Sequence, residues 1–386
     1  MTGEEMEGTV IEGEKSALPF SRGILAQSLI VSGLAPREAY EVAREVQSLL
    51  EPGKRYRERQ LARIVSAHLR RTRGAAVARR YRKSIDRRQV FFVSSGRGSA
   101  PFSKMVLVRS LRAAGLDMHT AARVAQEVEL RLRASHSRSL SSGRLRSAVS
   151  AALREGLGPE YVERYLLWHR VKRSSKPLVV LVGGATGVGK STLSIELANV
   201  LEIPHVASTD IIREMMRTMF SADLLPHIHY ASYQADSVRR FTTGADPMLA
   251  GFQEQAALVA VGVKAMISRA IKENSSIIVN GVHIVPGIID AAEFETCITQ
   301  FLLVLDDASS HRARFGRRQR RAPRRRARDY LRYFPAIRRI QNFLVDRARE
   351  CGTPTIESHY FEETLDAALN YVTETVAKSP FFGGRR

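Results

Sequence analysis

The sequence predicts an α/β fold, in which a domain with a mostly parallel five-stranded sheet follows two small, mainly helical domains. Three observations carry this prediction. One segment of the first half occurs twice, the second half alternates short apolar runs with longer helical patterns, and a glycine-rich loop follows the first of those runs. Strands that alternate with helices are typical of parallel sheets. The expected boundaries are 8–88, 89–173 and 174–378 for the domains and 379–386 for a disordered tail.

The duplicated segment is recognised by its opening residues. Pro19-Phe20-Ser21-Arg22 recurs as Pro101-Phe102-Ser103-Lys104, and residues 19–50 match residues 101–132 at 14 of 32 positions. After a two-residue insertion the match resumes, for example at Tyr81 and Tyr165. A unit of this length is too long for a solenoid repeat and long enough to fold as a small domain.

Each copy is predicted to be a short hairpin followed by helices. Apolar residues recur at helical spacing in 39–50 and 121–132, and short extended stretches precede the copies at 9–11 and 90–93. With the Pro-Phe-Ser-Arg/Lys opening, this pattern resembles the ATP-cone, a regulatory nucleotide-binding module, over about residues 12–172. The resemblance implies that Arg22 and Lys104 face the phosphates of a regulatory adenine nucleotide. The alternative is that both cations are solvated surface charges.

The second half is predicted to hold five strands, at 178–183, 204–208, 276–280, 299–305 and 354–357. After the first strand, Gly184-x-x-x-x-Gly189-Lys190-Ser191 satisfies the Walker A pattern, and the amphipathic run Leu193–Leu201 follows. A dinucleotide-binding G-x-G-x-x-G pattern is excluded because Thr192 stands where its third glycine would fall. Glycines let backbone N–H groups converge on phosphate oxygens, and the start of the helix adds partial positive charge.

We therefore expect ATP and Mg²⁺ as cofactors. Lys190 is expected to reach the β- and γ-phosphates and to act in catalysis, and the Ser191 hydroxyl to complete the magnesium shell. The predicted ATP-binding residues are Gly184, Ala185, Thr186, Gly187, Val188, Gly189, Lys190, Ser191 and Thr192.

Polar residues at the end of the second strand are candidates for the transfer itself. Asp210 follows this strand and can orient or deprotonate an acceptor hydroxyl or bind the metal, while Arg213 and Arg217 can hold an anion. We assign Arg213 both a catalytic and a substrate-binding role. The alternative is that Thr209 and Asp210 only cap the helix that follows.

An ordered set of motifs over about residues 178–372 resembles the 2-phosphoglycerate kinase family. These motifs are the loop Gly184–Thr192, Ser208–Glu214, His229–Ala235, Gly251–Gln255, Gly281–Pro286, His311–Phe315, Tyr330–Phe334 and Ile337–Gln341. The resemblance implies ATP-dependent phosphorylation of the 3-hydroxyl of 2-phosphoglycerate, a small phosphorylated acid, to give 2,3-bisphosphoglycerate. It also fits an N-terminal ATP-cone, which members of the family often carry.

The predicted acceptor-binding residues are Arg213, Arg217, His229, Ser232, Tyr233 and His283. His283 could equally be a core histidine with satisfied hydrogen bonds. One position departs from the expected pattern, because Asn280 stands where we expect an acid before Gly281-Val282-His283. If an acid there normally steadies Mg²⁺, that duty passes to Asp210 or Asp306, or the acceptor differs.

Residues 312–328 contain ten arginines and no acid, in a place where many small-molecule kinases carry a mobile lid. We expect Arg312 to act in catalysis, and Arg314 and Arg318 to close over the transferred group. As a plain charge run, the same segment would be solvated or would bind nucleic acid.

The distribution of charge limits the choice of partners. The net charge of +21 divides into +17 for residues 1–176, −4 for 177–300 and +8 for 301–386. This leaves an ATP-responsive nucleic-acid-binding regulator as an alternative that is not favoured, beside a kinase for another phosphorylated acid or sugar phosphate. No apolar run predicts a membrane span, and two cysteines and an acidic N-terminus predict a cytoplasmic protein. The sequence leaves homo-oligomer formation open.

Overall fold

The computed structural model of the chain describes residues 9–12, 17–88, 92–95, 98–134, 139–237, 246–321 and 327–382. Contacts between residues separate two compact units, Met1–Phe102 with Leu132–Leu145 and Ser103–Arg131 with Arg146–Arg386. Most of the helical part of the second repeat therefore belongs to the same unit as the five-stranded sheet. Among the described helices, none has the length and apolar character needed to cross a membrane.

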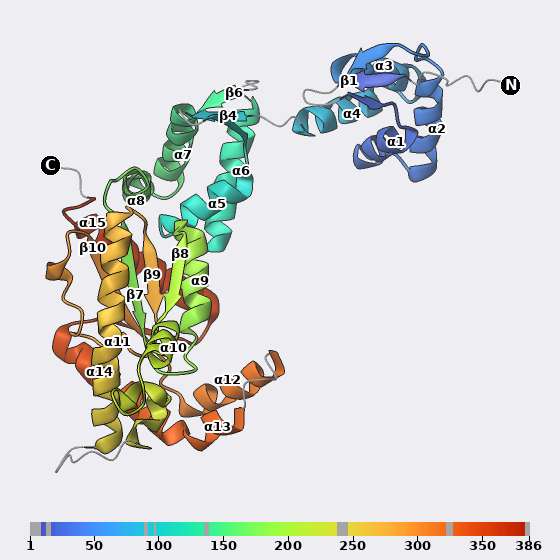
Figure 1. The fold of residues 1–386 in the computed structure, drawn as a ribbon. Helices are drawn as coiled ribbons and strands as arrows, with labels where there is room; N and C mark the ends of the chain where they lie inside the picture. The colour runs from blue at the N-terminus through green and yellow to red at the C-terminus, as the bar shows by residue number, and fades with distance from the viewer. Residues whose placement is uncertain are drawn as a thin grey trace. The chain divides into compact units, whose positions relative to one another are not determined.

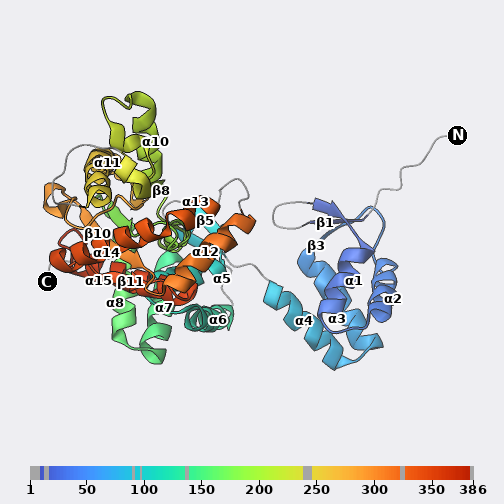
Figure 2. The ribbon, with the colours of Figure 1, turned by 90° about the horizontal axis from the view of Figure 1, so that it is seen from below.

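The first repeat combines a small sheet with four helices (Figure 2). Its elements are β1 (Val10–Glu12), β2 (Ala17–Pro19), α1 (Arg22–Val31), α2 (Pro36–Gln47), β3 (Arg55–Arg57), α3 (Glu58–Thr72) and α4 (Ala75–Arg88). Strand β1 pairs antiparallel with β2 and parallel with β3. The helices enclose a core of their own, which includes Leu29, Val42, Val65 and Leu69.

The second repeat has the same order of elements and the same strand pairing. Its elements are β4 (Phe92–Ser95), β5 (Gly98–Pro101), α5 (Lys104–Ala113), α6 (Met118–Ala134), β6 (Ser139–Ser141), α7 (Ser142–Gly156) and α8 (Pro159–Val171). Strand β4 pairs antiparallel with β5 and parallel with β6. The predicted hairpin and helices are thus confirmed in both copies, whereas β3 and β6 were not predicted, because three residues are too few to reveal an alternating pattern.

The five strands of the second half form one parallel sheet in the order β11-β10-β7-β9-β8 (Figure 1). These strands are β7 (Leu178–Gly183), β8 (His205–Ser208), β9 (Ile277–Asn280), β10 (Cys297–Val304) and β11 (Thr355–Glu357). All five predicted strands are confirmed. Strand β7 is central and buried along its whole length, as expected of a parallel strand covered on both faces.

Helices cover both faces of this sheet. They are α9 (Lys190–Leu201), α10 (Thr209–Met219), α11 (Pro247–Lys272), α12 (Ala308–Arg321), α13 (Ala327–Arg332), α14 (Phe334–Cys351) and α15 (Phe361–Lys378), with short 3₁₀ turns η1 (Pro226–His229), η2 (Ser232–Ser237) and η3 (Ala291–Glu293). Alternate residues of β7 face opposite sides: Val179 and Leu181 pack with residues of α11, and Val180 and Val182 pack with residues of α9 and α15. The result is a three-layer α/β/α domain.

The end of the chain differs from the sequence-based expectation. A disordered tail was predicted for 379–386, but Ser379 and Phe382 are 8% and 4% exposed. Phe382 packs into the core cluster that contains Leu365 and Trp168, and this apolar burial holds residues 379–382 against the domain. Residues 383–386 lie outside the described part of the chain.

Candidate active site

The glycine loop lies at the carboxyl end of β7 and leads directly into α9, which begins at Lys190. Gly184, Gly187 and Gly189 have φ angles of 139°, 93° and 105°. At Gly184 a Cβ atom would also collide with the Leu303 carbonyl of β10. Glycine adopts such a backbone without a steric penalty. The sharp turn and the helix that follows it make a place where backbone N–H groups can bind phosphate.

Helix α12 holds the outer side of this loop. His311 is fully buried, and its Nε2 donates a hydrogen bond to the Thr186 carbonyl at 2.8 Å. Arg314 Nη1 donates to the Val188 carbonyl at 2.7 Å. Burial lowers the pKa of His311, so the ring that stacks on Phe315 is neutral at pH 7. These hydrogen bonds from α12 to two loop carbonyls hold the shape of the loop. They do not use the backbone N–H groups of the loop, which can bind phosphate.

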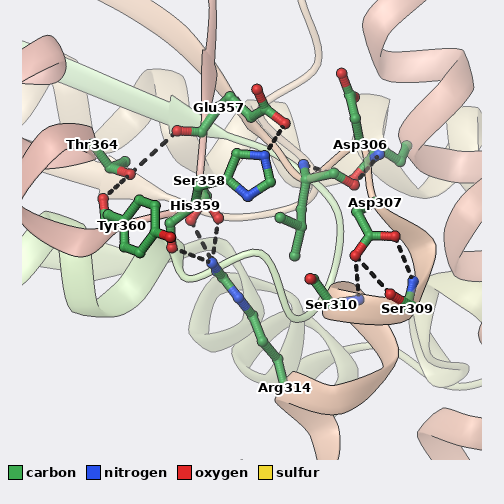
Figure 3. Close-up of polar contacts among 12 residues, drawn as sticks. Asp306, Asp307, Ser309, Ser310, Arg314, Glu357, Ser358, His359, Tyr360 and Thr364 are labelled. Carbon is green, nitrogen blue, oxygen red and sulfur yellow. Dashed lines mark hydrogen bonds and ion pairs between the residues drawn. The ribbon is translucent and has the colours of Figure 1, made fainter.

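Arg314 also joins the loop to the end of β11 (Figure 3). Its guanidinium donates to Ser358 Oγ at 2.8 Å, to the Ser358 carbonyl, and to the His359 carbonyl at 3.4 Å. The structure therefore places Arg314 behind the loop, in contact with protein oxygens. Figure 3 also shows Asp307, whose carboxylate accepts hydrogen bonds from Ser309 and Ser310 at the start of α12; these bonds hold its pKa well below its usual range.

The other predicted arginines of this segment are less constrained. Arg312 is exposed, and its guanidinium lies 5.0 Å from the centre of the Phe334 ring, in cation–π contact. An exposed guanidinium held only by an aromatic ring can move to a ligand at small cost. The side chain of Arg318 lies outside the described residues.

Lys190 and Ser191 occupy the first turn of α9. Lys190 Nζ donates to the Ala185 carbonyl at 2.7 Å, across the mouth of the loop. The Ser191 hydroxyl donates to Asn280 Oδ1 at 3.3 Å, and the Asn280 amide donates to the Ala207 carbonyl at 3.1 Å. These contacts connect α9 to the ends of β9 and β8.

The contacts of Asn280 give a physical reason for the missing acid. Asn280 is 3% exposed, and its amide must accept from a hydroxyl on one side and donate to a carbonyl on the other. A carboxylate at this position could accept from Ser191 but could not donate to Ala207. It would instead place a negative charge against the carbonyl oxygen in a buried site, which is costly.

Asp210 lies in the first turn of α10, and its carboxylate is not used to cap that helix. The cap is Ser208, whose Oγ accepts from the Asp210 N–H at 3.2 Å. Asp210 is exposed, and among the described residues its carboxylate has no hydrogen bond or ion pair. The interpretation that Asp210 serves as a cap is therefore wrong, and the carboxylate is free to meet a ligand.

A buried chain of hydrogen bonds connects α10 to the segment around η1. Thr209 Oγ1 lies 2.8 Å from His283 Nδ1, and His283 Nε2 lies 2.8 Å from Gln255 Oε1. Gln255 Nε2 donates to the carbonyls of His227, at 2.5 Å, and Tyr230, at 3.0 Å. Gly281 is required beside this chain, because a Cβ atom there would collide with the Thr209 side chain.

The directions of these hydrogen bonds follow from the two carbonyls. Carbonyls only accept, so the Gln255 NH₂ group must face them and its oxygen must face His283. His283 then donates a hydrogen bond from Nε2 to Gln255 Oε1, and its Nδ1 accepts a hydrogen bond from the Thr209 hydroxyl. Burial lowers the pKa of His283 to about 4, against an opposing effect of the nearby Asp210, so the ring is neutral at pH 7. His283 is thus a satisfied core histidine that positions the residues around it.

The predicted acceptor-binding side chains cluster between α10 and η2. Arg213 Nη1 donates to the carbonyls of Ile228, at 2.9 Å, and Tyr230, at 3.1 Å. Arg217 is paired with Glu214, and both side chains are about half exposed. His229 Nε2 donates to the Phe220 carbonyl at 3.0 Å.

Two further predicted acceptor residues are packed into the domain. Ser232 is 6% exposed, and Tyr233 contacts the rings of Tyr330 and Tyr333 at 5.9 and 5.5 Å. Of the six predicted acceptor residues, Arg217 is thus the one held only by an exposed ion pair.

Three residues that organise the site were not among the predicted site residues. They are Gln255, His311 and Gln341, whose side chain exchanges hydrogen bonds with the backbone of Leu305 after β10. Gln255 and Gln341 share one sequence signal, since each is a polar residue on the apolar face of an amphipathic helix. For His311 the partner is a loop carbonyl far away in the sequence, which no local pattern reveals.

The donor set near the loop fits a magnesium ion that is bound mainly through water and phosphate. Mg²⁺ prefers oxygen ligands and keeps several waters, and one or two protein oxygens suffice beside a nucleotide. The Ser191 hydroxyl and the Asp210 carboxylate are oxygen donors of this kind. Among the described residues, no group of three His, Cys, Asp or Glu side chains could hold a metal ion without the nucleotide.

In the repeats, Arg22 and Lys104 both begin a helix behind a serine cap. Ser21 Oγ accepts from Ile24 N, and Ser103 Oγ accepts from Val106 N, both at 3.4 Å. The serine of the repeated Pro-Phe-Ser-Arg/Lys motif therefore has a structural task in both copies. Lys104 Nζ donates to Gln126 at 2.8 Å, and Arg22 is exposed.

A parallel sheet with a glycine loop after its central strand, a lysine and a serine at the start of the next helix, and an exposed carboxylate after the edge strand β8 define a P-loop phosphotransferase. No family model matches the chain. It is 39% identical over 291 residues to a curated relative named 2-phosphoglycerate kinase from Methanothermobacter thermautotrophicus, a match that covers 74% of this chain and 94% of the relative. The chain therefore belongs to the 2-phosphoglycerate kinase family.

Two more relatives of the same name agree with this assignment. The protein of Methanopyrus kandleri is 36% identical over 74% of this chain and 88% of its own length, and that of Thermococcus kodakarensis is 38% identical over 70% and 91%. The matches are longer than residues 174–378, so they include part of the repeated segment. Between 26% and 30% of this chain lies outside each of these matches.

Among solved structures, a gluconokinase from Sinorhizobium meliloti 1021 aligns over 51% of this chain and 93% of its own. Its 15% identity and TM-score of 0.29 are too low to bear on the fold or the function.

Proposed function

We propose that this chain is an ATP-dependent kinase that phosphorylates the 3-hydroxyl of 2-phosphoglycerate and releases 2,3-bisphosphoglycerate and ADP. The observation that carries this proposal is the phosphate loop with Lys190 and Ser191 at the start of α9, in a chain that is 39% identical to a curated relative named 2-phosphoglycerate kinase. A magnesium ion held by Ser191, Asp210 and the nucleotide would neutralise phosphate charge.

In the transfer, the acceptor oxygen forms a bond to the γ-phosphorus while the bond to the β,γ-bridging oxygen of ATP breaks. The hydroxyl proton passes to the Asp210 carboxylate, which follows β8, an edge strand separated by β9 from the strand β7 that leads into the loop. Lys190 exchanges the Ala185 carbonyl for the β- and γ-phosphates. Most of the rate enhancement comes from positioning and charge neutralisation.

The acceptor's anionic groups are proposed to lie against the segment from α10 to η2. Arg217 gives up its exposed pair with Glu214 at small cost and binds the carboxylate or phosphate. Arg213, His229, Ser232, Tyr233 and His283 shape this surface, mainly through the contacts that hold η1 in place. Arg312 closes from α12 over the transferred group. Within the described residues, the Asn280 side chain hydrogen-bonds to Ser191 and to the Ala207 carbonyl, and these bonds account for an amide at this position without a different acceptor.

An assay of ADP release over a panel of acceptors tests this proposal. We expect 2-phosphoglycerate to give the largest kcat/KM, ahead of 3-phosphoglycerate, glycerol phosphates and sugar phosphates. Lys190→Ala should abolish the signal, while Lys176→Ala, at a surface ion pair with Glu295, should not. Equal or greater activity with another phosphorylated acceptor would overturn the assignment of the substrate.

We further propose that the two repeats bind a regulatory adenine nucleotide through Arg22 and Lys104, in line with their likeness to ATP-cones. Each cation is the first residue of a helix that follows a two-stranded hairpin. The backbone N–H groups at the start of such a helix favour an anion. Equilibrium dialysis with ATP and ADP should find nucleotide bound beyond one per chain. Arg22→Ala and Lys104→Ala should reduce that number, and a ratio of one per chain in the unaltered protein would refute the proposal.

A further inference from the structure

A cavity of about 450 Å³ lies between α7, α8 and the residues that follow α15, and we call it the arginine cavity. Its lining includes Arg146 of α7, His169 and Arg170 of the last turn of α8, and Arg173 just beyond it. No residue of the phosphate loop or of the acceptor segment takes part. Small-molecule sites typically have volumes of about 300–1,000 Å³, so the arginine cavity is large enough for a metabolite.

The positive charges of the arginine cavity are not neutralised by the protein around them. In the described part of the chain, the guanidinium groups of Arg146, Arg170 and Arg173 have no hydrogen bond or ion pair. Other arginines of the same repeat do have partners: Arg131 is 2.5 and 2.6 Å from carboxylates, and Arg164 is 3.5 Å from one. The acid that lies near the cavity, Glu202, is itself paired with Lys172 at 3.0 Å.

His169 adds an unused polar atom to the same wall. Its Nε2 is buried and has no hydrogen-bond partner within the described residues. Burial, together with the positive charges of Lys172 and Arg146, lowers its pKa to about 4, so the ring is neutral at pH 7. Buried polar atoms without a partner are rare in folded proteins. His169 lines the arginine cavity, but its Nε2 is covered by protein, so a ligand there would supply the missing hydrogen bond once the ring turns toward it.

The arginine cavity also has an apolar lining, which comes from Leu166 of α8 and from Phe381 and Phe382 after α15. Apolar surface beside charged groups lowers the local dielectric constant and strengthens their attraction for an anion, most of all at the partly buried Arg146. It also offers contact area to carbon atoms. An inorganic ion would leave this contact area unused, so the lining favours an organic anion.

The internal repeat shows that these side chains are not shared features of the module. In the first copy, the positions that correspond to Arg146, His169, Arg170 and Arg173 hold Ala62, Ile85, Asp86 and Gln89. The first copy folds without basic residues at these four positions. The four basic residues of the second copy therefore do not serve a folding role that the two copies share.

We propose that the arginine cavity is a second ligand site, which binds a small organic phosphate that carries two or more negative charges. The three guanidinium groups hold the charged groups, His169 donates or accepts one hydrogen bond, and the two phenylalanines contact the organic part. Both a bisphosphorylated acid and a nucleoside diphosphate have this chemistry. The site does not depend on the proposed function, because it shares no residue with the phosphate loop.

Equilibrium dialysis with radiolabelled 2,3-bisphosphoglycerate and, separately, ADP tests this site. The triple variant Arg146→Gln/Arg170→Gln/Arg173→Gln should bind one molecule fewer per chain than the unaltered protein, for at least one of the two probes. The probe that binds to the unaltered protein with one more molecule per chain than to the triple variant shows whether the cavity takes a bisphosphorylated acid or a nucleoside diphosphate. Arg146→Gln alone should weaken the extra binding at least tenfold, which keeps the test informative if the triple variant does not fold.

A charge-matched control separates a built site from general attraction of anions. Arg59→Gln/Arg63→Gln/Arg70→Gln removes three exposed arginines from α3 of the first repeat and should leave the number of bound molecules unchanged. Equal stoichiometry in the triple variant and the unaltered protein for both probes would overturn the proposal. An equal loss in the control would overturn it as well. Transfer activity is measured in parallel, so a failure of the proposed function would be seen separately.

Discussion

The two repeats have the same strand pairing and helix order, yet the described residues of their helices belong to different core clusters. The first repeat closes its own core around Leu29, Val42 and Leu69. In the second repeat, Ala113, Leu167 and Trp168 belong to the same core cluster as residues of α9 and α15. Within the described residues, the first copy thus has a core cluster of its own, whereas helices of the second copy share one with the domain that holds the five-stranded sheet.

Three polar contacts mark this difference. Arg112, only 3% exposed, pairs with Glu362 at 3.1 Å and Asp366 at 2.8 Å on α15. Trp168 Nε1 donates to Thr373 Oγ1 at 3.2 Å, and Arg164 donates to Asn370 at 2.9 Å. The first repeat has Ile30, Ser84 and Arg80 at the corresponding positions, so two of the three groups are absent from that copy.

The largest expected effect concerns the location of catalysis. Lys190→Ala should lower kcat for phosphoryl transfer at least ~10³-fold, because Lys190 is the cation that neutralises the transferred charge. Steady-state ADP release measures this. Near-normal activity in Lys190→Ala would break the comparison, since it would move catalysis away from the domain that contains the five-stranded sheet.

A second expected effect is on stability, and it separates the two units further. Arg112→Ala should lower the free energy of unfolding by about 2 kcal/mol, because it removes the packing of a buried side chain and its ion pairs with two partly exposed carboxylates. Urea unfolding followed by the fluorescence of the single tryptophan, Trp168, reports on this unit. Arg131→Ala, at a 40%-exposed arginine of the same repeat, is the matched control and should cost less than about 1 kcal/mol. Equal losses would mean that the Arg112 contact does not anchor the repeat.

Acid should weaken the two units over different pH ranges. His283 has a folded pKa of about 4 against 6.5 when unfolded, so the unfolded state binds the extra proton and stability falls as the pH drops from 6.5 toward 4. The expected loss is about 2 to 3 kcal/mol. In the first repeat, the hydrogen bond from His68 lowers the pKa of Glu45, and stability from that carboxylate is lost only as the pH falls below 4.5.

The fluorescence of Trp168 and far-UV circular dichroism distinguish these two transitions. The urea midpoint reported by Trp168 fluorescence should fall between pH 6.5 and 5. His283→Asn should reduce this dependence but not abolish it, because burial also lowers the pKa of His169, in the same unit, to about 4. An unchanged urea midpoint across this range would contradict a neutral, buried His283.

The smallest expected effect comes from one hydrogen bond between the second repeat and α15. Trp168→Phe should lower the free energy of unfolding by about 1 to 2 kcal/mol, because the bond to Thr373 is lost in a buried place. Circular dichroism measures the loss, since the variant has no tryptophan. Thr373→Val should give a similar loss, and the double variant should lose less than the sum. Full additivity would show that the two side chains do not interact.

Much of the fold follows from patterns that are local in the sequence. The five strands, the loop from Gly184 to Ser191 and the helical repeats all appear as runs or spacings within about ten residues. The departure at Asn280 is also visible in the sequence, but its reason is not, because the Ala207 carbonyl that requires an amide lies on another strand.

The site was harder to predict where one group has two plausible partners. Asp210 could cap α10 or meet a ligand, and only the structure assigns the cap to Ser208. Arg314 stands in an arginine-rich run that predicts a lid, yet its guanidinium binds carbonyls behind the loop. The attachment of the second repeat depends on Arg112 and on acids about 250 residues away, which no periodic pattern can reveal.

The most direct test of the proposed activity is the identity of the product formed from ATP and 2-phosphoglycerate. ³¹P NMR of the reaction mixture should show two phosphate monoester signals on one glycerate, formed in equal amounts with ADP. Release of inorganic phosphate with unchanged 2-phosphoglycerate would contradict the account, because it would mean that the loop hydrolyses ATP without transferring its phosphoryl group to this acceptor.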